Sequence, residues 1–398
     1  MYTGAMNHLA RRSPWRLALG CLLPLVGLSG CQRTWPAVHN AEPTSVAPIA
    51  PMICSTAQVA YRQALLAAGR AVVQVPVADL WEKPQRRSAL ADQAFLGELV
   101  QTVPGQVAAC GSTVGAGDFL HVLTESGYRA WAEIASLRPL PAGETAYRQS
   151  GPMVRVTARL SNVYLQPMVT LEKPALVVPL DVPLRTVRTV DERWIEILLP
   201  DGRAAYIQAG DIEPLPSTPS ATSATSATLG GADCVIEHAR RYLGTPYLWG
   251  GRSTLGVDCS GLVLSSMNAC GLMPPRDAGP QHGWDRTLAV PNDERALQAG
   301  DLLFFGKRNA DSSSASASAS MAVPASAMTT ASTPTSMAVP ASATAVGGRI
   351  THVGIYVGQG RFIHATTHQR PVVQESVLAD PHWTAIWLGT RRPQYGGR

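Results

Sequence analysis

Residues 258–263 read Asp-Cys-Ser-Gly-Leu-Val, and this stretch decides the fold of the C-terminal part of the chain. The apolar residues that follow fall on one helical face and are Leu262, Val263, Met267 and Cys270. Asp258 is a typical N-cap residue, which places Cys259 in the first turn. The unpaired N–H groups and the dipole of a first turn favour the reactive thiolate form of a cysteine. The pattern indicates a nucleophile; the alternative is a small buried residue at a helix start.

A second stretch, residues 351–365, reads Thr-His-Val-Gly-Ile-Tyr-Val-Gly-Gln-Gly-Arg-Phe-Ile-His-Ala and predicts a β-hairpin with residues 358–360 as its loop. In this hairpin Gly354 faces His364, so His352 lies on the same face, diagonal to His364 and within reach of it. Two such imidazoles can form a base and the group that orients it. With a cysteine at a helix start, they are the parts of a papain-like site.

A metal site is the alternative for the same three side chains, because Cys259, His352 and His364 are residue types that bind zinc. The chain has neither Cys-x-x-Cys nor His-Glu-x-x-His spacing. We therefore predict no metal and no cofactor.

These motifs resemble the NlpC/p60 family of cell-wall cysteine peptidases. The matching segments are 244–247 (Gly-Thr-Pro-Tyr), 249–251 (Trp-Gly-Gly), 258–261 (Asp-Cys-Ser-Gly), 300–302 (Gly-Asp-Leu), 352–356 (His-Val-Gly-Ile-Tyr) and 364–365 (His-Ala). The resemblance implies an α+β papain-like domain over residues 231–398 with a catalytic triad of Cys259, His352 and His364. It also implies that Tyr247 lies close to the nucleophile, where it can assist the backbone N–H of Cys259 in binding the oxyanion.

The N-terminal half is β-rich, with short apolar runs broken by Gly, Pro and Asp and a hairpin-turn signal at Asp201-Gly202. Residues 58–150 and 151–215 have a similar plan. They resemble two bacterial SH3 barrels, on segments 93–100, 162–164 and 199–203. The predicted fold class is therefore multidomain: two all-β SH3-like barrels followed by the α+β domain.

The family subgroup with two such barrels resembles γ-D-glutamyl-L-diamino acid endopeptidases. The resemblance implies cleavage of the bond between D-Glu and diaminopimelate in peptidoglycan stem peptides or muropeptides with a free N-terminal L-Ala. An ammonium group in a buried site requires an acid. The candidate substrate contacts are Glu98, Tyr128, Asp258, Ser260, Arg276 and Asp277. For Glu98 the alternative is an ordinary surface residue of a strand.

Residues 1–31 resemble a lipoprotein signal peptide. Three arginines precede an apolar run over residues 17–28, and a lipobox-like segment, Leu-Ser-Gly-Cys, ends at Cys31. We expect a lipid at Cys31, a periplasm-facing position in the cell envelope, and outer-membrane sorting because Gln32 follows the cysteine. The alternative is an ordinary secretory signal with an incidental cysteine. Residues 32–57 are Pro- and Ala-rich and predict a tether.

Two low-complexity segments interrupt the folded parts. Residues 216–230 predict a flexible linker, and residues 307–348 predict a disordered insert in the peptidase domain that leaves its fold intact. Without Cys21 and Cys31, five of the seven cysteines remain. This odd number suits one free thiol, with Cys54–Cys110 and Cys234–Cys270 as candidate disulfides.

The chain has 398 residues and a formal net charge of +5, and it lacks a basic stripe with interleaved aromatic residues, so nucleic acid is excluded as a partner. We expect a monomeric cell-wall hydrolase. Two other functions stay open: a peptidoglycan-binding lipoprotein without activity, and an amidase or acyltransferase on the same papain-like fold, because fold does not fix reaction.

Overall fold

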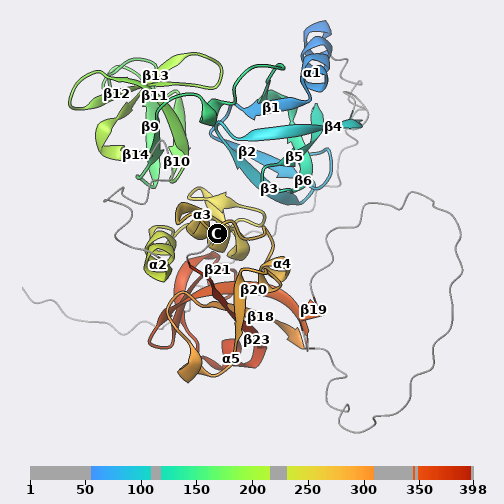
Figure 1. The fold of residues 1–398 in the computed structure, drawn as a ribbon, viewed down its shortest axis with the longest axis vertical. Coiled ribbons are helices and arrows are strands. Elements are labelled where there is room, and N and C mark those ends of the chain that lie inside the picture. Colours follow the sequence, from blue (N-terminus) through green and yellow to red (C-terminus); the bar gives the residue numbers. More distant parts are fainter. Residues whose placement is uncertain (1–54, 109–117, 216–230, 309–343, 346–347, 396–398) are drawn as a thin grey trace, which may run out of the picture. The chain divides into compact units, whose positions relative to one another are not determined.

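The structure is a computed structural model that describes residues 55–108, 118–215, 231–308, 344–345 and 348–395 (Figure 1). These residues belong to a compact unit that begins at Ala50. Within the described residues, no helix is both long enough and apolar enough to cross a bilayer. The predicted signal peptide with Cys31, the tether up to residue 54, the linker 216–230, the Cys54–Cys110 disulfide and most of the insert lie outside the described residues.

Helix α1 (Thr56–Ala68) opens the β-rich half. Ser55 caps it through a reciprocal pair of hydrogen bonds with Gln58, and Gly69 ends it in the left-handed region at φ 67°. Leu65, fully buried, fixes the helix on the first sheet.

The first β-rich stretch forms an antiparallel sheet in the order β3-β2-β6-β5-β4-β1-β7. Its elements are β1 (Arg70–Val73), β2 (Val77–Trp81), β3 (Leu90–Phe95), β4 (Leu99–Ala108), β5 (Phe119–Thr124), β6 (Arg129–Glu133), the 3-10 helix η1 (Ile134–Ser136) and β7 (Leu137–Pro139). A further 3-10 helix, η2 (Tyr147–Gln149), leads to the second stretch.

The second stretch repeats the same plan, with the strand order β10-β9-β13-β12-β11-β8-β14. Its elements are β8 (Met153–Val156), β9 (Leu160–Tyr164), β10 (Leu176–Pro179), β11 (Pro183–Thr189), β12 (Trp194–Leu198), β13 (Ala204–Gln208), the 3-10 helix η3 (Ala209–Asp211) and β14 (Ile212–Leu215). The predicted similarity of the two stretches and the turn at Asp201-Gly202 are confirmed, since β12 pairs with β13 across that turn.

The predicted closed barrels are not found. In both stretches the pairing of the described strands runs from one edge to the other, and the two edge strands, β3 and β7 or β10 and β14, are not paired with each other. Each stretch is therefore an open sheet that curls around its own apolar core.

The C-terminal part is α+β, as predicted, and its main sheet has the order β17-β23-β18-β20-β21-β22, with β19 paired to β20. Its helices are α2 (Ala232–Arg241), α3 (Cys259–Ala269), α4 (Ala278–His282), α5 (Pro381–Ile386) and the 3-10 helix η4 (Glu294–Ala296). Its strands are β15 (Arg252–Ser253), β16 (Gly256–Val257), β17 (Thr287–Val290), β18 (Leu302–Arg308), β19 (Thr344–Ala345), β20 (Gly348–Gly358), β21 (Arg361–Thr366), β22 (Val372–Val377) and β23 (Trp387–Pro393).

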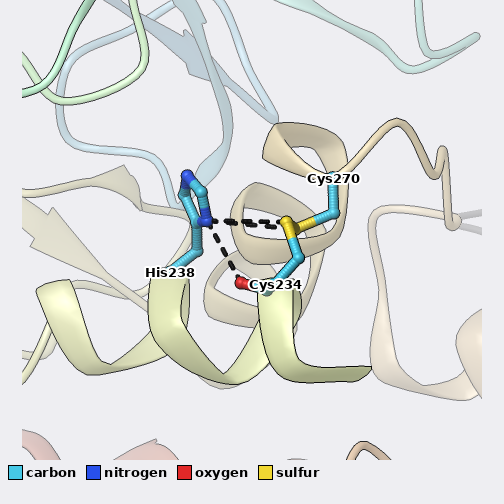
Figure 2. Close-up of side chains that lie close together, drawn as sticks. All are labelled: Cys234, His238 and Cys270. Carbon is cyan, nitrogen blue, oxygen red and sulfur yellow. Dashed lines mark hydrogen bonds between the residues drawn. A yellow bond between two sulfur atoms is a disulfide. The ribbon is translucent and has the colours of Figure 1, made fainter. Parts of the chain in front are cut away.

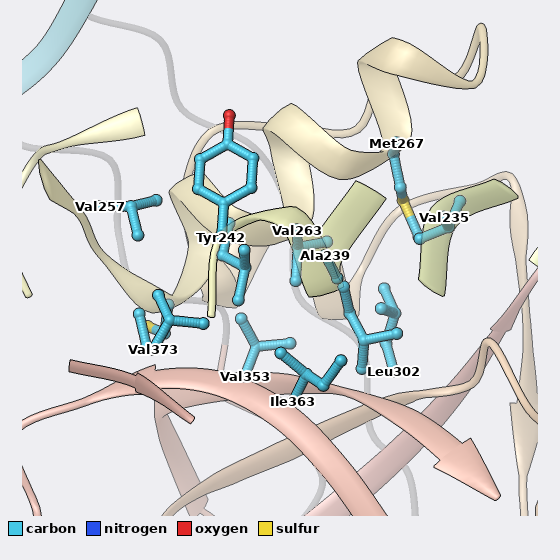
Figure 3. Packing of buried hydrophobic residues seen from close by; sticks show 14 of the residues in the cluster. Val235, Ala239, Tyr242, Val257, Val263, Met267, Leu302, Val353, Ile363 and Val373 are labelled. Carbon is cyan, nitrogen blue, oxygen red and sulfur yellow. The ribbon is translucent and has the colours of Figure 1, made fainter. Parts of the chain in front are cut away.

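The core of this domain lies between helices α2 and α3 and the main sheet (Figure 3). Val235 and Ala239 from α2 and Val263 from α3 meet Val353 and Ile363 from the sheet, and all five are fully buried. This packing holds α3, which begins at Cys259, against the strands that carry the two predicted histidines.

The β20–β21 hairpin differs from the prediction at its loop. Gly358 pairs with Arg361, so it belongs to the strand instead of the loop, and a bulge follows before Tyr356 pairs with Phe362. The pairing of Ile355 with Ile363 restores the predicted register around the histidines.

The predicted insert, 307–348, begins later and ends earlier than its composition suggested. β18 continues to Arg308 and pairs there with Gly348, the first residue of β20. The two ends of the insert therefore leave from neighbouring strands, and the main sheet continues across it, as predicted for an added loop.

Candidate active site

Cys259 is the first residue of α3, and Asp258 caps this helix, as predicted. The Asp258 carboxylate accepts hydrogen bonds from the backbone N–H groups of Gly261 at 2.6 Å and Gly250 at 2.9 Å. A Cβ at Gly261 would lie 2.1 Å from the carbonyl oxygen of Gly251, so only glycine fits beside the nucleophile. The capping residue thereby joins the start of α3 to the loop that precedes it.

The Cys259 side chain is only 7% exposed, and this burial raises the pKa of its thiol to about 12. Asp258 raises the pKa further, while the N–H of Val353, Arg276 and the N–H of Ser260 act in the opposite direction. The prediction that the helix start favours the thiolate is therefore wrong for the free protein, because burial of the sulfur raises its pKa. The bond from Val353 brings the sulfur next to β20, one residue from His352.

His352 and His364 form a hydrogen-bonded pair, with 2.8 Å between Nε2 of His352 and Nδ1 of His364. Nε2 of His364 in turn lies 2.9 Å from the hydroxyl of Ser376 on β22. Burial lowers the pKa of His352 to about 4, Asp258 acts against this, and His382 adds to it. Burial, together with His352, holds the pKa of His364 well below its usual range. Both rings are therefore neutral near pH 7.

One arrangement of the ring protons that satisfies both hydrogen bonds leaves His352 as a base. Ser376 can accept the proton of His364 Nε2, which leaves Nδ1 of His364 as the acceptor for the N–H of His352 Nε2. Nδ1 of His352 is then the nitrogen that is free of a proton. The ring is thus oriented to act as a base through that atom.

Trp383, on the short helix α5, is buried against both histidines and was not predicted. Its ring stacks on His352 at 5.5 Å between centroids and meets His364 edge-on at 4.7 Å. Asp380 caps α5 and Pro381 follows it, and these two residues are the local signal for a helix start. These two residues predict where the helix begins, but they do not predict that it packs against His352 and His364.

Tyr247 is partly buried and packs against the core cluster that contains Cys259. Burial raises the pKa of its hydroxyl, and Cys259 is the next cause, which places the two side chains close together as predicted. The tyrosine is therefore neutral and able to donate a hydrogen bond at this end of α3.

Arg276 is buried, with 4% exposure, and connects the start of α3 to the first sheet. Its guanidinium donates to Asp258 at 2.9 Å, to the Ser260 hydroxyl at 3.0 Å and to Asp92 of β3 at 2.7 Å. Asp92, fully buried, was not predicted, and its position within a strand gave no signal. Arg276, Asp258 and Ser260 thus support one another, and the structure brings these three predicted residues together.

The other predicted substrate contacts, Tyr128, Asp277 and Glu98, lie at two separate positions. The hydroxyl of Tyr128 donates to Asp277 at 3.4 Å, and burial raises the pKa of the Asp277 carboxyl. Glu98, in contrast, is paired with Arg252 at 2.7 Å and lies 3.7 Å from Arg148. The acids that raise the pKa of Tyr128 are Asp277, Asp92 and Glu82, and Glu98 is not among them.

The zinc alternative is not favoured by the geometry of the histidines. Nε2 of His352 and both nitrogens of His364 are already engaged in the chain that ends at Ser376. The three side chains therefore offer a metal only the sulfur of Cys259 and one nitrogen of His352, fewer protein ligands than a zinc site uses.

Comparison with known proteins places this site in a family. Residues 244–329 and 342–392 match the model of the NlpC/P60 family, and these segments contain Cys259, His352 and His364. The C-terminal part of the chain is therefore similar to the NlpC/P60 domain, and it is called by that name below.

The proteins that this chain is similar to include bacterial peptidases. The chain is 26% identical over 317 residues to a gamma-D-glutamyl-L-lysine dipeptidyl-peptidase of Bacillus cereus, covering 76% of this chain and 75% of that one. It is 34% identical over 136 residues to a protein of the same name from Bacillus subtilis, but this match covers only 34% of this chain and 32% of the relative.

A solved structure shares the fold over a larger part of the chain. The crystal structure of an NlpC/P60 family protein from Bacillus cereus superposes with a TM-score of 0.57 at 24% sequence identity, covering 82% of this chain and 99% of the other. The β-rich half and the NlpC/P60 domain therefore occur together in both proteins.

Proposed function

We propose that this protein is a cell-wall cysteine peptidase in which Cys259 is the nucleophile, His352 the general base and His364 the residue that orients it. The observation that carries the proposal is the pair of hydrogen bonds from His352 through His364 to Ser376. It leaves one ring nitrogen of His352 to take a proton, beside the strand residue whose N–H meets the sulfur of Cys259.

The reaction is acyl transfer through a thioester. His352 takes the thiol proton, and the sulfur attacks the carbonyl carbon of the scissile amide. The C–N bond then breaks, and His352 gives the proton to the leaving amine. Water next attacks the thioester carbon, passes a proton to His352 and releases the acid, and the proton returns to the sulfur of Cys259.

The helix start stabilises the charge that develops on the carbonyl oxygen. The N–H of Cys259 is in the first turn of α3, where it has no acceptor within the helix. The neutral hydroxyl of Tyr247 is a second donor close to the sulfur. Both groups point to an oxyanion site at this helix end.

The substrate we propose is a peptidoglycan stem peptide or muropeptide that is cut between D-Glu and diaminopimelate and carries a free N-terminal L-Ala. The names of the relatives support γ-D-glutamyl specificity. Asp277 and Tyr128 form the pair best suited to bind the ammonium group, since burial raises the pKa of the Asp277 carboxyl more than Arg276 lowers it, and a bound cation would favour its charged form. Glu98 could bind a substrate amine only if its ion pair with Arg252 broke, so its role as a substrate contact stays a prediction.

The identity of the β-rich half and the location of the protein extend this proposal. The strand order that recurs in both sheets supports two SH3-like domains. A basic flank, an apolar run and Leu-Ser-Gly-Cys ending at Cys31 support a lipoprotein of the outer membrane that faces the periplasm. Globomycin, an inhibitor of lipoprotein signal peptidase, should then cause the precursor to accumulate, whereas an unchanged product would exclude the lipid anchor.

The test uses the tripeptide L-Ala-γ-D-Glu-diaminopimelate and mass spectrometry of the products. Wild-type protein should release L-Ala-D-Glu and free diaminopimelate, and Cys259→Ala should release neither. Release of other fragments from whole peptidoglycan would indicate an amidase. Binding of the tripeptide by wild-type protein without turnover would indicate a binding protein, and unchanged turnover by Cys259→Ala would exclude the cysteine mechanism.

A further inference from the structure

A second cluster of reactive side chains lies away from the candidate active site, where α2 meets the end of α3 (Figure 2). Cys234 and His238 are one turn apart on α2, and Cys270 caps the end of α3. The two cysteines form the predicted disulfide, which the structure confirms. Nδ1 of His238 lies 3.9 Å from each sulfur, and the three ligand atoms lie within 4.8 Å of one another.

The other side of the His238 ring faces a carboxylate. His238 is only 4% exposed, and its Nε2 lies 3.6 Å from Asp181, in the turn between β10 and β11. In the part of the chain that the structure describes, neither Nε2 of His238 nor either carboxylate oxygen of Asp181 has a hydrogen-bond partner. Buried polar groups without partners are costly, so these unpaired atoms require an explanation.

We propose that Cys234, Cys270 and His238 form a binding site for one Zn²⁺ ion when the disulfide is reduced. A dithiol reductant supplies the two electrons and two protons that open the disulfide, and is itself oxidised to a disulfide. Zinc binding then releases both thiol protons. The ion takes two thiolate sulfurs and Nδ1 of His238, and water completes the tetrahedron.

The histidine must change tautomer, and the structure provides for this change. In the disulfide form Nδ1 lies 3.1 Å from the backbone oxygen of Cys234, to which it can donate. With the metal on Nδ1, the ring proton moves to Nε2, which faces Asp181. A carboxylate behind a zinc-bound histidine is the usual arrangement for fixing that tautomer.

The backbone spacing suits zinc without rearrangement. The Cα atoms of the two cysteines are 6.0 Å apart. Two sulfurs bound to one zinc ion lie about 3.8 Å apart in tetrahedral geometry, a separation that rotation of the cysteine side chains can provide. Asp181, which faces the ring of His238, also lines a cavity of about 360 Å³.

The charges and the ligand types favour zinc over hard cations. Two thiolates neutralise Zn²⁺, and the carboxylate of Asp181 lies 3.9 Å from Arg155, which it shares with Glu213. Sulfur and imidazole ligands select zinc over Ca²⁺ and Mg²⁺, which prefer oxygen. In both states, disulfide and zinc, α2 stays tied to the helix that begins at Cys259.

The experiment is a Co²⁺ titration of the full chain in a Cys21→Ser, Cys31→Ser, Cys54→Ser, Cys110→Ser, Cys259→Ala background, which removes the other five thiols as ligands. After reduction with a phosphine we expect one Co²⁺ per chain, a sulfur-to-cobalt absorption in the near ultraviolet, and displacement by Zn²⁺. The oxidised protein should give no such absorption. Zinc should also raise the melting temperature of the reduced protein only.

Two variants keep both thiols and test the geometry. His238→Gln and Asp181→Asn should each weaken zinc binding by about 10- to 100-fold. Glu237→Gln is the matched control, because that exposed acid pairs with Arg241 instead of facing the cysteines. Equal Co²⁺ binding in oxidised and reduced protein, no binding at all, or full binding by a Cys270→Ser variant whose circular dichroism is native would each overturn the proposal.

Discussion

At the scale of single residues, the state of the nucleophile depends on what covers it. Cys259 lies at a helix start, which stabilises a thiolate, yet its pKa is raised because the sulfur is buried beside Asp258. Burial also lowers the pKa of His352, although Asp258 acts against this. The free protein therefore holds a neutral thiol and a neutral base.

Ser376 should contribute to catalysis through the tautomer of His364. Its hydroxyl is the acceptor that leaves Nδ1 of His364 available to His352. Ser376→Ala should lower kcat about tenfold, the effect of losing one hydrogen bond of about 1.4 kcal/mol, with KM nearly unchanged. Ser376→Thr keeps the hydroxyl and should retain most of the activity. Equal kcat for wild type and Ser376→Ala would show that the tautomer is set elsewhere.

The buried histidine pair should make stability depend on pH. Because the folded-state pKa of His364 lies below the unfolded value, the unfolded chain binds more protons as pH falls below about 6.5. Folding stability is thus fully present above that pH and is lost on acidification. Relative to His364→Gln, the wild type should lose up to about 1.4 kcal/mol per pH unit. Urea unfolding at pH 7, 6 and 5 measures this difference, and parallel curves would contradict it.

Local chemistry made part of the site predictable. The N-cap at Asp258 and the alternation in the hairpin are set by near neighbours, so the positions of Cys259, His352 and His364 followed from the sequence. The pKa of Cys259 did not, because burial depends on packing from distant segments. Asp92 was missed for the same reason, since its partner Arg276 is far away in the sequence.

At the scale of elements, the short helix α5 holds the two catalytic candidates in place. Trp383 contacts His352 and His364, and with Phe305 and Phe362 it belongs to a core cluster separate from the one under α3. Elements of this kind are difficult to predict, because a helix of one or two turns carries too little periodic pattern.

Replacing this indole should disturb the histidines as well as the packing. Trp383→Leu should lower the free energy of unfolding by about 3 kcal/mol, as expected for loss of a large buried side chain. It should also lower kcat more than it raises KM, because the rings of His352 and His364 lose their support. Trp383→Phe should restore part of both. A variant with reduced stability and unchanged kcat would limit Trp383 to packing.

The loop of the β20–β21 hairpin is shorter than its sequence predicted. The Gly-Gln-Gly sequence at 358–360 predicted a three-residue loop, but Gly358 is paired and a bulge takes up the difference. Glycine permits either geometry, so the sequence alone could not choose between them.

At the scale of the whole molecule, the first sheet and the NlpC/P60 domain share a buried ionic network. Arg276 forms ion pairs with Asp92 of β3 and with Asp258. Arg252, the first residue of β15, forms an ion pair with Glu98. These contacts connect residues that are far apart in sequence, so composition and motif spacing could not reveal them. The two-sheet plan itself was predictable, because its turn signals recur along the chain.

Removing the central cation of this network should be costly. Arg276→Met leaves two buried carboxylates without their partner and should lower the free energy of unfolding by about 3–5 kcal/mol. Arg295→Met, at an exposed pair with Asp293, is the matched control and should leave stability unchanged. Chemical denaturation measures both. Equal stability of the two variants would mean that the ionic network does not hold the first sheet to the domain.

The buried position of Cys259 has a consequence for how the chain matures under oxidising conditions. Thiol–disulfide exchange requires an accessible thiolate, and the folded protein presents neither at this sulfur. Incorrect pairing of Cys259 with Cys234 or Cys270 is therefore a hazard of the nascent chain alone. Once α3 has packed against the sheet, burial of Cys259 keeps its thiol from attacking the Cys234–Cys270 disulfide at the other end of the helix.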